Sequence, residues 1–163
     1  MRKEGQKIVA VCGVKNSGKT TLLAELVKEL AARGKRTAVI KHDGHDFSCD
    51  IPGTDSYRLK EAGAYGTAVF SDSRILIHKT GTGEREEALI RMFPEADVIL
   101  IEGMKERGFP KIEVIREGIS RYPVSNPEGR FLIVTDRDPQ DYEEETAGFE
   151  ETARIVDRIL QES

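Results

Sequence analysis

Short hydrophobic runs alternate along this chain with segments in which hydrophobic residues recur every three or four positions. The run over 7–12 predicts a buried strand. After a loop, one helical face is formed by Leu22, Leu23, Leu26, Val27 and Leu30. Gly34 ends this helix, and a short strand over 36–41 follows. A strand–helix–strand unit of this kind predicts parallel strands in one sheet.

The same alternation continues to the C-terminus. It predicts further strands over 67–70, 74–78, 97–102, 111–116 and 131–135, and further helices over 55–62 and 84–92. Polar and apolar residues alternate within 111–116, which favours a position nearer the sheet edge. The acidic stretch 136–151 is predicted to be a solvated loop. A final helix is expected to bury Ala153, Ile155, Val156, Ile159 and Leu160.

The loop after the first strand carries a phosphate-binding motif. Residues 13–21 read Gly-Val-Lys-Asn-Ser-Gly-Lys-Thr-Thr, which matches G-x-x-x-x-G-K-[ST] between a strand and a helix. Glycines let successive N–H groups turn toward phosphate oxygens, and the helix N-terminus adds partial positive charge. Lys19 is expected to contact the β- and γ-phosphates, and Thr20 to bind Mg²⁺. The predicted nucleotide-binding residues are Gly13, Lys15, Asn16, Ser17, Gly18, Lys19, Thr20 and Thr21.

Strands and helices that alternate around such a loop predict an α/β fold. The expected architecture is a three-layer P-loop NTPase sandwich with a mostly parallel sheet and additional edge strands. At 163 residues, the chain is expected to form a single P-loop nucleotide-binding domain over 1–163.

Composition limits which kinds of partner and which cellular compartment are expected for this chain. The formal net charge of −4 argues against a general nucleic-acid binder. The N-terminus has no apolar signal region and no segment approaches membrane-spanning length, so a cytoplasmic protein without a membrane partner is expected. Cys12 and Cys49 lack the close spacing of a metal site or redox pair, and Cys12 is expected to be a core residue.

A second acidic group is expected beside the Mg²⁺ of a phosphate-loop protein. Asp97 and Glu102 stand at opposite ends of one predicted strand, about 16 Å apart at about 3.3 Å per residue. Ligands of open α/β sheets bind beyond the carboxyl ends of the strands. Glu102 is therefore predicted to act with Thr20 as a metal ligand and with Lys19 as a catalytic residue.

The segment 41–46 leaves the carboxyl end of the second predicted strand. Lys41 and His42 begin it, and Asp43, His45 and Asp46 follow. These side chains could contact phosphate or substrate, bind a metal, or simply hydrate a loop. Lys41 and His42 are included among the predicted nucleotide-binding residues.

A turn-rich segment then enters the next helix. Its charged residues Asp50, Asp55 and Arg58 are predicted to contact the nucleotide or substrate. The alternative is an ordinary helix entry, in which Thr54 is the N-cap and Asp55 complements the helix dipole.

Taken together, these motifs resemble the MobB family of molybdopterin-guanine dinucleotide biosynthesis adaptor proteins. The resemblance covers about residues 7–116. It is carried by the phosphate loop, by Lys41-His42 with His45, by Asp50-x-Pro-Gly-x-Asp-Ser-x-Arg58, by Ala62-Gly63-Ala64, by Val98-Ile-Leu-Ile-Glu102-Gly103 with Lys105, and by Lys111-Ile-Glu113-Val. This chain departs from the family at Val14, Gly44 and Thr54.

The resemblance implies a GTP-binding protein that assists attachment of GMP to molybdopterin. It implies Mg²⁺ and GTP as ligands, a MobA-type guanylyltransferase as partner, molybdopterin as a ligand of the assembly or of this chain directly, and a homodimer. It implies at most slow GTP hydrolysis, so the chain would act mainly as an accessory protein.

Two other classes use the same phosphate loop. A small-molecule kinase would need a lid of arginines over the γ-phosphate, for which Arg58, Arg107 or Lys105 are the candidates. A metallochaperone GTPase would use His42 and His45 as metal ligands. Guanine selection has one candidate, Thr135-Asp136-Arg137-Asp138, which resembles the Thr-Lys-x-Asp guanine readers of GTPases without their lysine, and its alternative is an acidic turn.

Overall fold

The computed structural model describes residues 4–43, 47, 50–80 and 86–162. Contacts divide the chain into two compact units, one formed by residues 1–42 with 89–163 and the other by residues 43–88. The larger unit contains the phosphate loop. The single nucleotide-binding domain expected over 1–163 stays a prediction.

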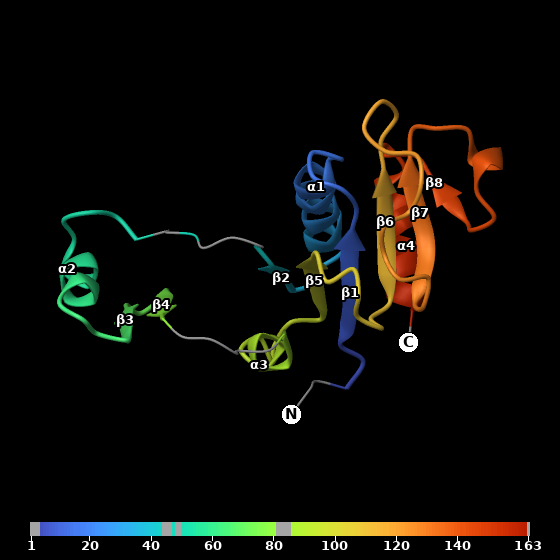
Figure 1. Ribbon diagram of the computed structural model, residues 1–163. Coiled ribbons are helices and arrows are strands. Elements are labelled where there is room, and N and C mark those ends of the chain that lie inside the picture. The colour runs from blue at the N-terminus through green and yellow to red at the C-terminus, as the bar shows by residue number, and fades with distance from the viewer. Residues whose placement is uncertain (1–3, 44–46, 48–49, 81–85, 163) are drawn as a thin grey trace. The chain divides into compact units, whose positions relative to one another are not determined.

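The larger unit is built on a six-stranded sheet in the order β2-β5-β1-β6-β7-β8. Its strands are β1 (Lys7–Cys12), β2 (Thr37–Lys41), β5 (Val98–Glu102), β6 (Lys111–Ile115), β7 (Arg130–Thr135) and β8 (Thr146–Ala147). Every neighbouring pair is parallel, so the carboxyl ends of β1, β5, β6 and β7 share one edge (Figure 1). The predicted α/β class with a mostly parallel sheet is confirmed.

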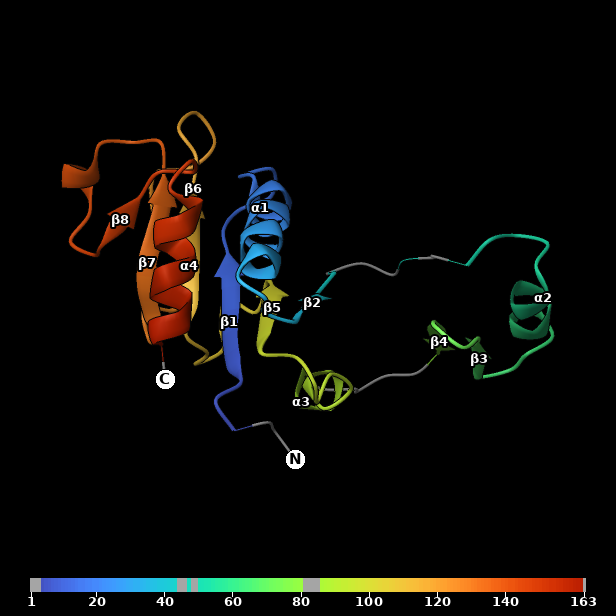
Figure 2. The same ribbon diagram turned by 180° about the vertical axis from the view of Figure 1, so that it is seen from behind.

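Helices cover this sheet because alternate strand residues point to opposite faces. On one face α1 (Lys19–Ala32) and α4 (Thr152–Gln161) lie side by side (Figure 2), and their leucines and isoleucines pack on Val9, Val11 and Leu100. On the other face, Ile90 from α3 (Glu86–Ile90) packs with Ile8 and Ile99. In the predicted final helix, Ile155, Val156 and Ile159 are buried as expected, but Ala153 is exposed, which corrects that prediction.

β6 is an interior strand, so the edge position predicted for 111–116 is wrong. It pairs with β1 on one side and β7 on the other, and all five of its residues are buried. Lys111 donates through Nζ to the carbonyls of Arg107 and Asn126, and the Glu113 carboxylate accepts from the backbone N–H groups of Val124 and Ser125. The polar residues of the pattern therefore hold connecting loops rather than facing solvent.

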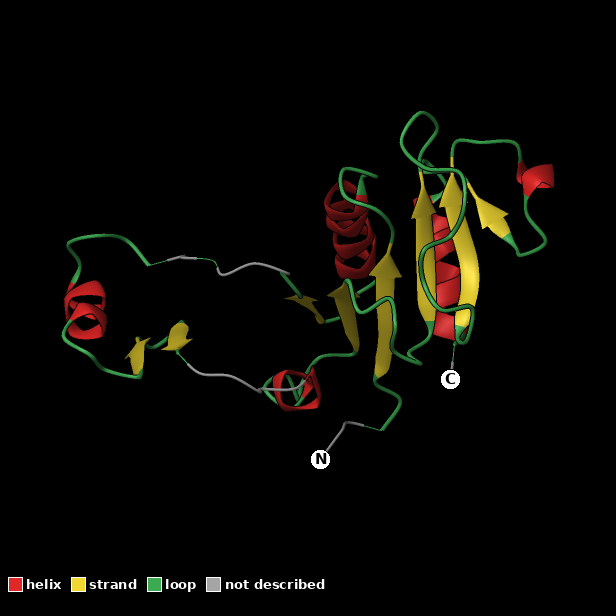
Figure 3. Cartoon of the chain, viewed as in Figure 1, coloured by secondary structure: helices red, strands yellow, loops and turns green. Residues whose placement is uncertain are grey.

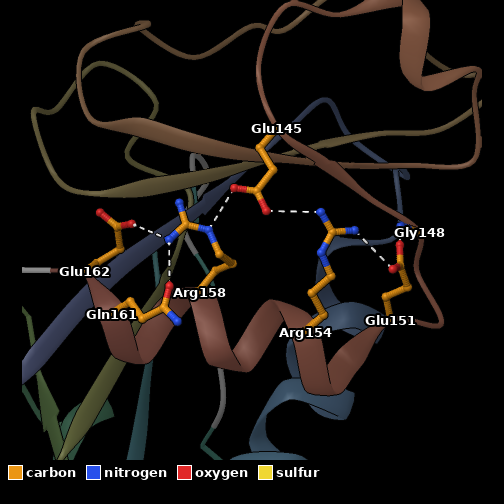
Figure 4. Close-up of polar contacts among 7 residues, drawn as sticks. All are labelled: Glu145, Gly148, Glu151, Arg154, Arg158, Gln161 and Glu162. Atoms are coloured by element: carbon orange, nitrogen blue, oxygen red, sulfur yellow. Dashed lines mark hydrogen bonds and ion pairs between the residues drawn. The ribbon is translucent and has the colours of Figure 1, made fainter.

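The acidic stretch 136–151 is more ordered than the predicted solvated loop. It contains the 3₁₀ helix η1 (Pro139–Asp141) and the edge strand β8, where Ala147 is buried. Its end is bound to α4: Glu145 accepts from Arg154 at 3.1 Å and Arg158 at 2.8 Å, and Glu151 accepts from Arg154 at 3.1 Å (Figure 4). Arginines spaced along one helix face neutralise these carboxylates.

The smaller unit consists of α2 (Asp55–Glu61) and an antiparallel hairpin of β3 (Gly66–Phe70) and β4 (Ile75–Lys79), drawn in red and yellow in Figure 3. The predicted helix and both predicted strands are present, and the hairpin is a separate two-stranded sheet. The predicted helix 84–92 corresponds to α3, and residues 84–85 lie outside the described residues. No described helix is long and apolar enough to cross a membrane.

Candidate functional site

The loop between β1 and α1 has the backbone of a phosphate cradle. Gly13, Asn16 and Gly18 have φ angles of 146°, 62° and 97°, in the left-handed region that favours glycine. A Cβ on Gly13 would lie 2.6 Å from the Val114 carbonyl oxygen and 2.9 Å from Ser17 Oγ. Glycine is therefore required at Gly13 both for its backbone angle and for the close approach of β6.

Two polar side chains inside the loop fit an anionic ligand. Lys19 Nζ donates to the carbonyl oxygens of Gly13 at 3.0 Å and Val14 at 2.7 Å, which holds the ammonium across the loop. The hydroxyl of Ser17 is buried, and no described residue is a hydrogen-bond partner for it. A buried hydroxyl without a partner costs free energy unless a ligand satisfies it. These observations fit a bound phosphate.

Glu102 lies beside the start of α1, as strand direction predicted. Its carboxylate accepts from Thr20 Oγ1 at 3.0 and 3.2 Å, and Lys41 Nζ lies 3.7 Å from Oε1. A hydroxyl and a largely buried carboxylate in contact are the hard oxygen ligands that Mg²⁺ prefers. Asp97 is at the other end of β5, where its Oδ2 accepts from the backbone N–H of Arg36 at 2.8 Å.

A hollow of about 460 Å³ lies over this loop. It is lined by eight residues, all of them predicted from the sequence: Lys15, Asn16, Gly18, Lys19, Thr20, Thr21, Lys41 and Glu102. Three of the lining residues are lysines, so the hollow is cationic apart from one carboxylate. A triphosphate with a divalent cation matches this charge pattern.

His42 follows β2 at the same edge. Its backbone N–H donates to the Glu102 carbonyl oxygen at 3.0 Å, and the next residue of that chain segment, Gly103, has a φ of 107° that favours glycine. The described residues contain no group of three or more His, Cys, Asp or Glu side chains that could hold a metal ion. His45 and Asp46, which end the predicted segment, lie outside the described residues.

Asp50, Asp55 and Arg58 belong to the smaller unit. Asp50 accepts from the backbone N–H of Ile51 at 3.0 Å and from Ser56 Oγ at 3.1 Å, which organises the turn before α2. Thr54 is the N-cap, as the alternative interpretation predicted, and its hydroxyl accepts from Tyr57 N at 3.4 Å. Asp55 and Arg58 are both strongly exposed, with 4.0 Å between their charged atoms.

Cys12 confirms its predicted core position at the end of β1. It is 1% exposed, and its Sγ donates to the Gly103 carbonyl oxygen at 3.2 Å. Burial, together with the nearby Glu113 carboxylate, raises the pKa of this thiol to about 11. Cys12 therefore stays protonated and unreactive. Cys49 lies outside the described residues.

Arg116 contacts the phosphate loop and was not predicted as a site residue. It directly follows β6, and its Nε donates to the Ser17 carbonyl oxygen at 3.4 Å. Its guanidinium stacks on Phe149 at 3.9 Å and lies 3.5 Å from Asp136 Oδ2. The only signal in the sequence was its place at the end of a strand, which mattered only once β6 was known to neighbour β1.

The candidate guanine-reading residues are engaged with the protein. Asp136 Oδ1 accepts from the backbone N–H of Glu117 at 2.7 Å, and Asp138 caps η1 by accepting from Gln140 N at 3.0 Å. Thr135, Asp136 and Arg137 nevertheless line a second hollow of about 460 Å³, at the carboxyl ends of β7 and β8. Guanine selection by this segment stays a prediction.

Comparison with known proteins decides the family. The family model of MobB, described as molybdopterin guanine dinucleotide synthesis protein B, matches residues 8–160. The chain belongs to the MobB family. It is 36% identical over 137 residues to the molybdopterin-guanine dinucleotide biosynthesis adapter protein of Escherichia coli, covering 80% of this chain and 78% of the relative. Against the protein of the same name from Haemophilus influenzae, identity is 32% over 155 residues, covering 93% and 86%.

Solved structures of MobB proteins share the fold. The structure of Bacillus subtilis MobB aligns with a TM-score of 0.75 at 23% identity, covering 94% of this chain and 96% of that one. A MobB homologue from Bacillus stearothermophilus aligns with a TM-score of 0.66 at 19% identity, covering 94% of each chain. The resemblance read from residues 7–116 is thus confirmed and extends over most of the MobB fold.

Proposed function

We propose that this MobB protein is an adapter in molybdopterin guanine dinucleotide biosynthesis that binds GTP with Mg²⁺ at the loop 13–21. The observation that carries the proposal is the contact of Thr20 with Glu102 beside the Lys19 cradle. These groups supply a cation, a hydroxyl and a carboxylate at one helix N-terminus, which is what a nucleotide phosphate with a divalent cation requires.

Each residue has a distinct part in this proposal. Lys19 Nζ donates to two loop carbonyl oxygens, and with nucleotide bound it would donate to the β- and γ-phosphates. Thr20 and Glu102 would hold the cation, and Lys41 balances the Glu102 charge. Mg²⁺, when bound, neutralises phosphate charge. Membership of the MobB family supports the expectation that hydrolysis is slow at most.

The proposed partner is a MobA-type guanylyltransferase. Molybdopterin would be held by the assembly of the two proteins or by this chain directly. The proposed location of this protein is the cytoplasm. The candidate residues for contact with the guanylyltransferase are the exposed Asp55 and Arg58, together with the turn at Asp50 that precedes them. We expect Asp50→Ala and Arg58→Ala to reduce stimulation of guanylyl transfer while GTP affinity stays within about twofold.

A small-molecule kinase and a metallochaperone GTPase are not favoured, because the chain matches MobB relatives over most of its length.

We also propose a homodimer. The hairpin of the smaller unit exposes large apolar side chains on both faces, with Phe70 82% and Ile75 75% exposed on one face and Val69 and Leu76 51% each on the other. Two-stranded sheets with so much exposed apolar surface are unstable alone in water. A second copy of the chain would cover this surface.

The central test is nucleotide binding by Lys19→Ala. A charge-assisted contact to phosphate contributes about 1.5–3 kcal/mol, so affinity for GTP should fall by roughly tenfold to a hundredfold while the fold is retained. Isothermal titration with GTP, with and without Mg²⁺, measures this, and Lys35→Ala, outside the hollow, is the matched control. Near-normal GTP affinity in folded Lys19→Ala would contradict the assignment of the loop.

A further inference from the structure

Arg116 reaches the phosphate loop from the side opposite to Glu102. In the sheet, β1 lies between β5 and β6, and Glu102 ends β5 while Arg116 follows β6. Both strands run parallel to β1, so both residues emerge at the edge where the loop begins. The loop is therefore flanked by a carboxylate on one side and a guanidinium on the other.

The guanidinium is packed directly on the loop backbone. Besides the 3.4 Å contact from Nε to the Ser17 carbonyl oxygen, a Cβ on Gly18 would lie 2.9 Å from Arg116 Nη2. Gly18 is the N-cap of α1, where the backbone N–H groups face a ligand. Glycine at this position thus leaves room for the arginine as well as for a positive φ.

Arg116 is held in place on its remaining sides. The Phe149 ring stacks at 3.9 Å, and Asp136 lies 3.5 Å from Nη1 and is itself fixed by the Glu117 N–H. Among the described residues, no hydrogen bond partner is found for the Nη2 donors, and the side chain is 38% exposed. A planar guanidinium group that is already oriented loses little conformational entropy when it binds an anion.

We propose that Arg116 is a second phosphate-binding cation, which contacts the nucleotide on the side away from the metal. The proposal rests on the proposed nucleotide binding of the loop. Thr20 and Glu102 would hold Mg²⁺, which would neutralise phosphate charge, and Glu102 ends β5, so the metal side of the nucleotide would lie toward β5. The Arg116 donors, on the β6 side, then face the phosphate nearest the nucleoside. The ligand class is a nucleoside diphosphate or triphosphate.

This position predicts a specific pattern of losses. Arg116→Ala should weaken binding of GDP and of GTP by a similar factor, roughly tenfold or more, and equally with and without Mg²⁺. Guanosine, which has no phosphate, should bind Arg116→Ala and wild type alike. Arg116→Lys keeps the positive charge but lacks the paired N–H donors of the guanidinium, so it should recover only part of the GDP affinity.

The measurement is isothermal titration of each variant with GDP, GTP and guanosine, alongside thermal unfolding. Arg33→Ala is the matched control, because Arg33 pairs with Glu29 and Asp157 at the end of α1 that lies away from the loop. A lowered melting temperature with unchanged GDP affinity would make Arg116 a structural residue and overturn the inference. If Arg116→Ala does not fold, unchanged GDP affinity in Arg116→Lys would overturn it equally. Failure of wild type to bind any nucleotide would instead refute the proposed function.

Discussion

At the residue scale, the site is defined by side chains that hold one another through hydrogen bonds. Lys19 donates to loop carbonyls and Thr20 to Glu102, so these contacts fix the groups that would contact phosphate and metal. Preorganised donors cost little reorganisation when a charged ligand arrives. The acidic residues at the two ends of β5 have different partners, because Glu102 contacts Thr20 at the start of α1 and Asp97 accepts from the backbone N–H of Arg36.

Glu102→Gln is expected to weaken the Mg²⁺-dependent part of GTP binding by roughly tenfold or more, because a neutral amide is a poor cation ligand. Asp97→Asn, at the other end of the same strand, is the matched control and should leave GTP affinity unchanged. Titration with GTP across a range of Mg²⁺ concentrations measures both. An equal effect of the two variants would mean that the metal is not held at the carboxyl end of β5.

At the element scale, polar side chains join strands and helices to the loops that connect them. Glu113 in β6 holds the loop at Val124 and Ser125, and Glu145 and Glu151 connect the acidic stretch with α4. Hydrogen bonds from the Gly148 backbone N–H and from Arg154 lower the pKa of Glu151. Folding therefore favours the ionised carboxylate at this helix start.

The lowered pKa of Glu151 makes part of the stability depend on pH. The contribution is present above the ordinary glutamate value of 4.5 and is lost as pH falls through the lower folded-state pKa. Glu151→Gln should destabilise the protein at pH 7 by no more than about 1 kcal/mol, because the side chain is partly exposed. Urea unfolding from pH 7 down to about pH 3 should show the variant and wild type converging.

Glu150→Gln is the control for this measurement, since no described residue forms a hydrogen bond or ion pair with Glu150. Its stability curve should run parallel to wild type throughout the pH range. A difference between Glu151→Gln and wild type that stays constant down to the acid limit would rule out the ionisation of Glu151 as its source.

At the scale of the whole molecule, the two units differ in how their apolar residues are used. The larger unit buries its interior strands β1, β5 and β6 on both faces, whereas the hairpin of the smaller unit leaves Phe70 and Ile75 exposed as directly paired residues. Exposed apolar pairs of this size are typical of an interface. The proposed homodimer provides a use for this surface.

Ile75→Asp and Ile77→Asp are expected to shift the protein from dimer to monomer, because each would place a charge in an apolar contact. Sedimentation velocity at micromolar protein concentration measures the shift. Ser73→Asp, in the turn between the strands, is the control and should leave the dimer intact. Dimers that survive both isoleucine substitutions would show that the hairpin is not the contact between copies.

The sequence by itself determined the features whose residues are contiguous or follow from strand direction. The glycines, Lys19 and Thr20 form a local motif between a strand and a helix, and Glu102, as the last residue of a strand parallel to β1, lies at the carboxyl edge. Hydrophobic periodicity predicted α1, β1, β5 and β7 because each makes a regular buried pattern.

Only the tertiary structure decided which strand ends meet. The order β5-β1-β6 brings Arg116 to the loop and places Lys111 and Glu113 in the interior, although their alternating pattern is that of an edge strand. Alternation reports only which residues are polar, and a buried carboxylate becomes favourable once backbone N–H groups from a distant loop satisfy it. Such partners are defined by sheet order, which no local segment of the sequence encodes.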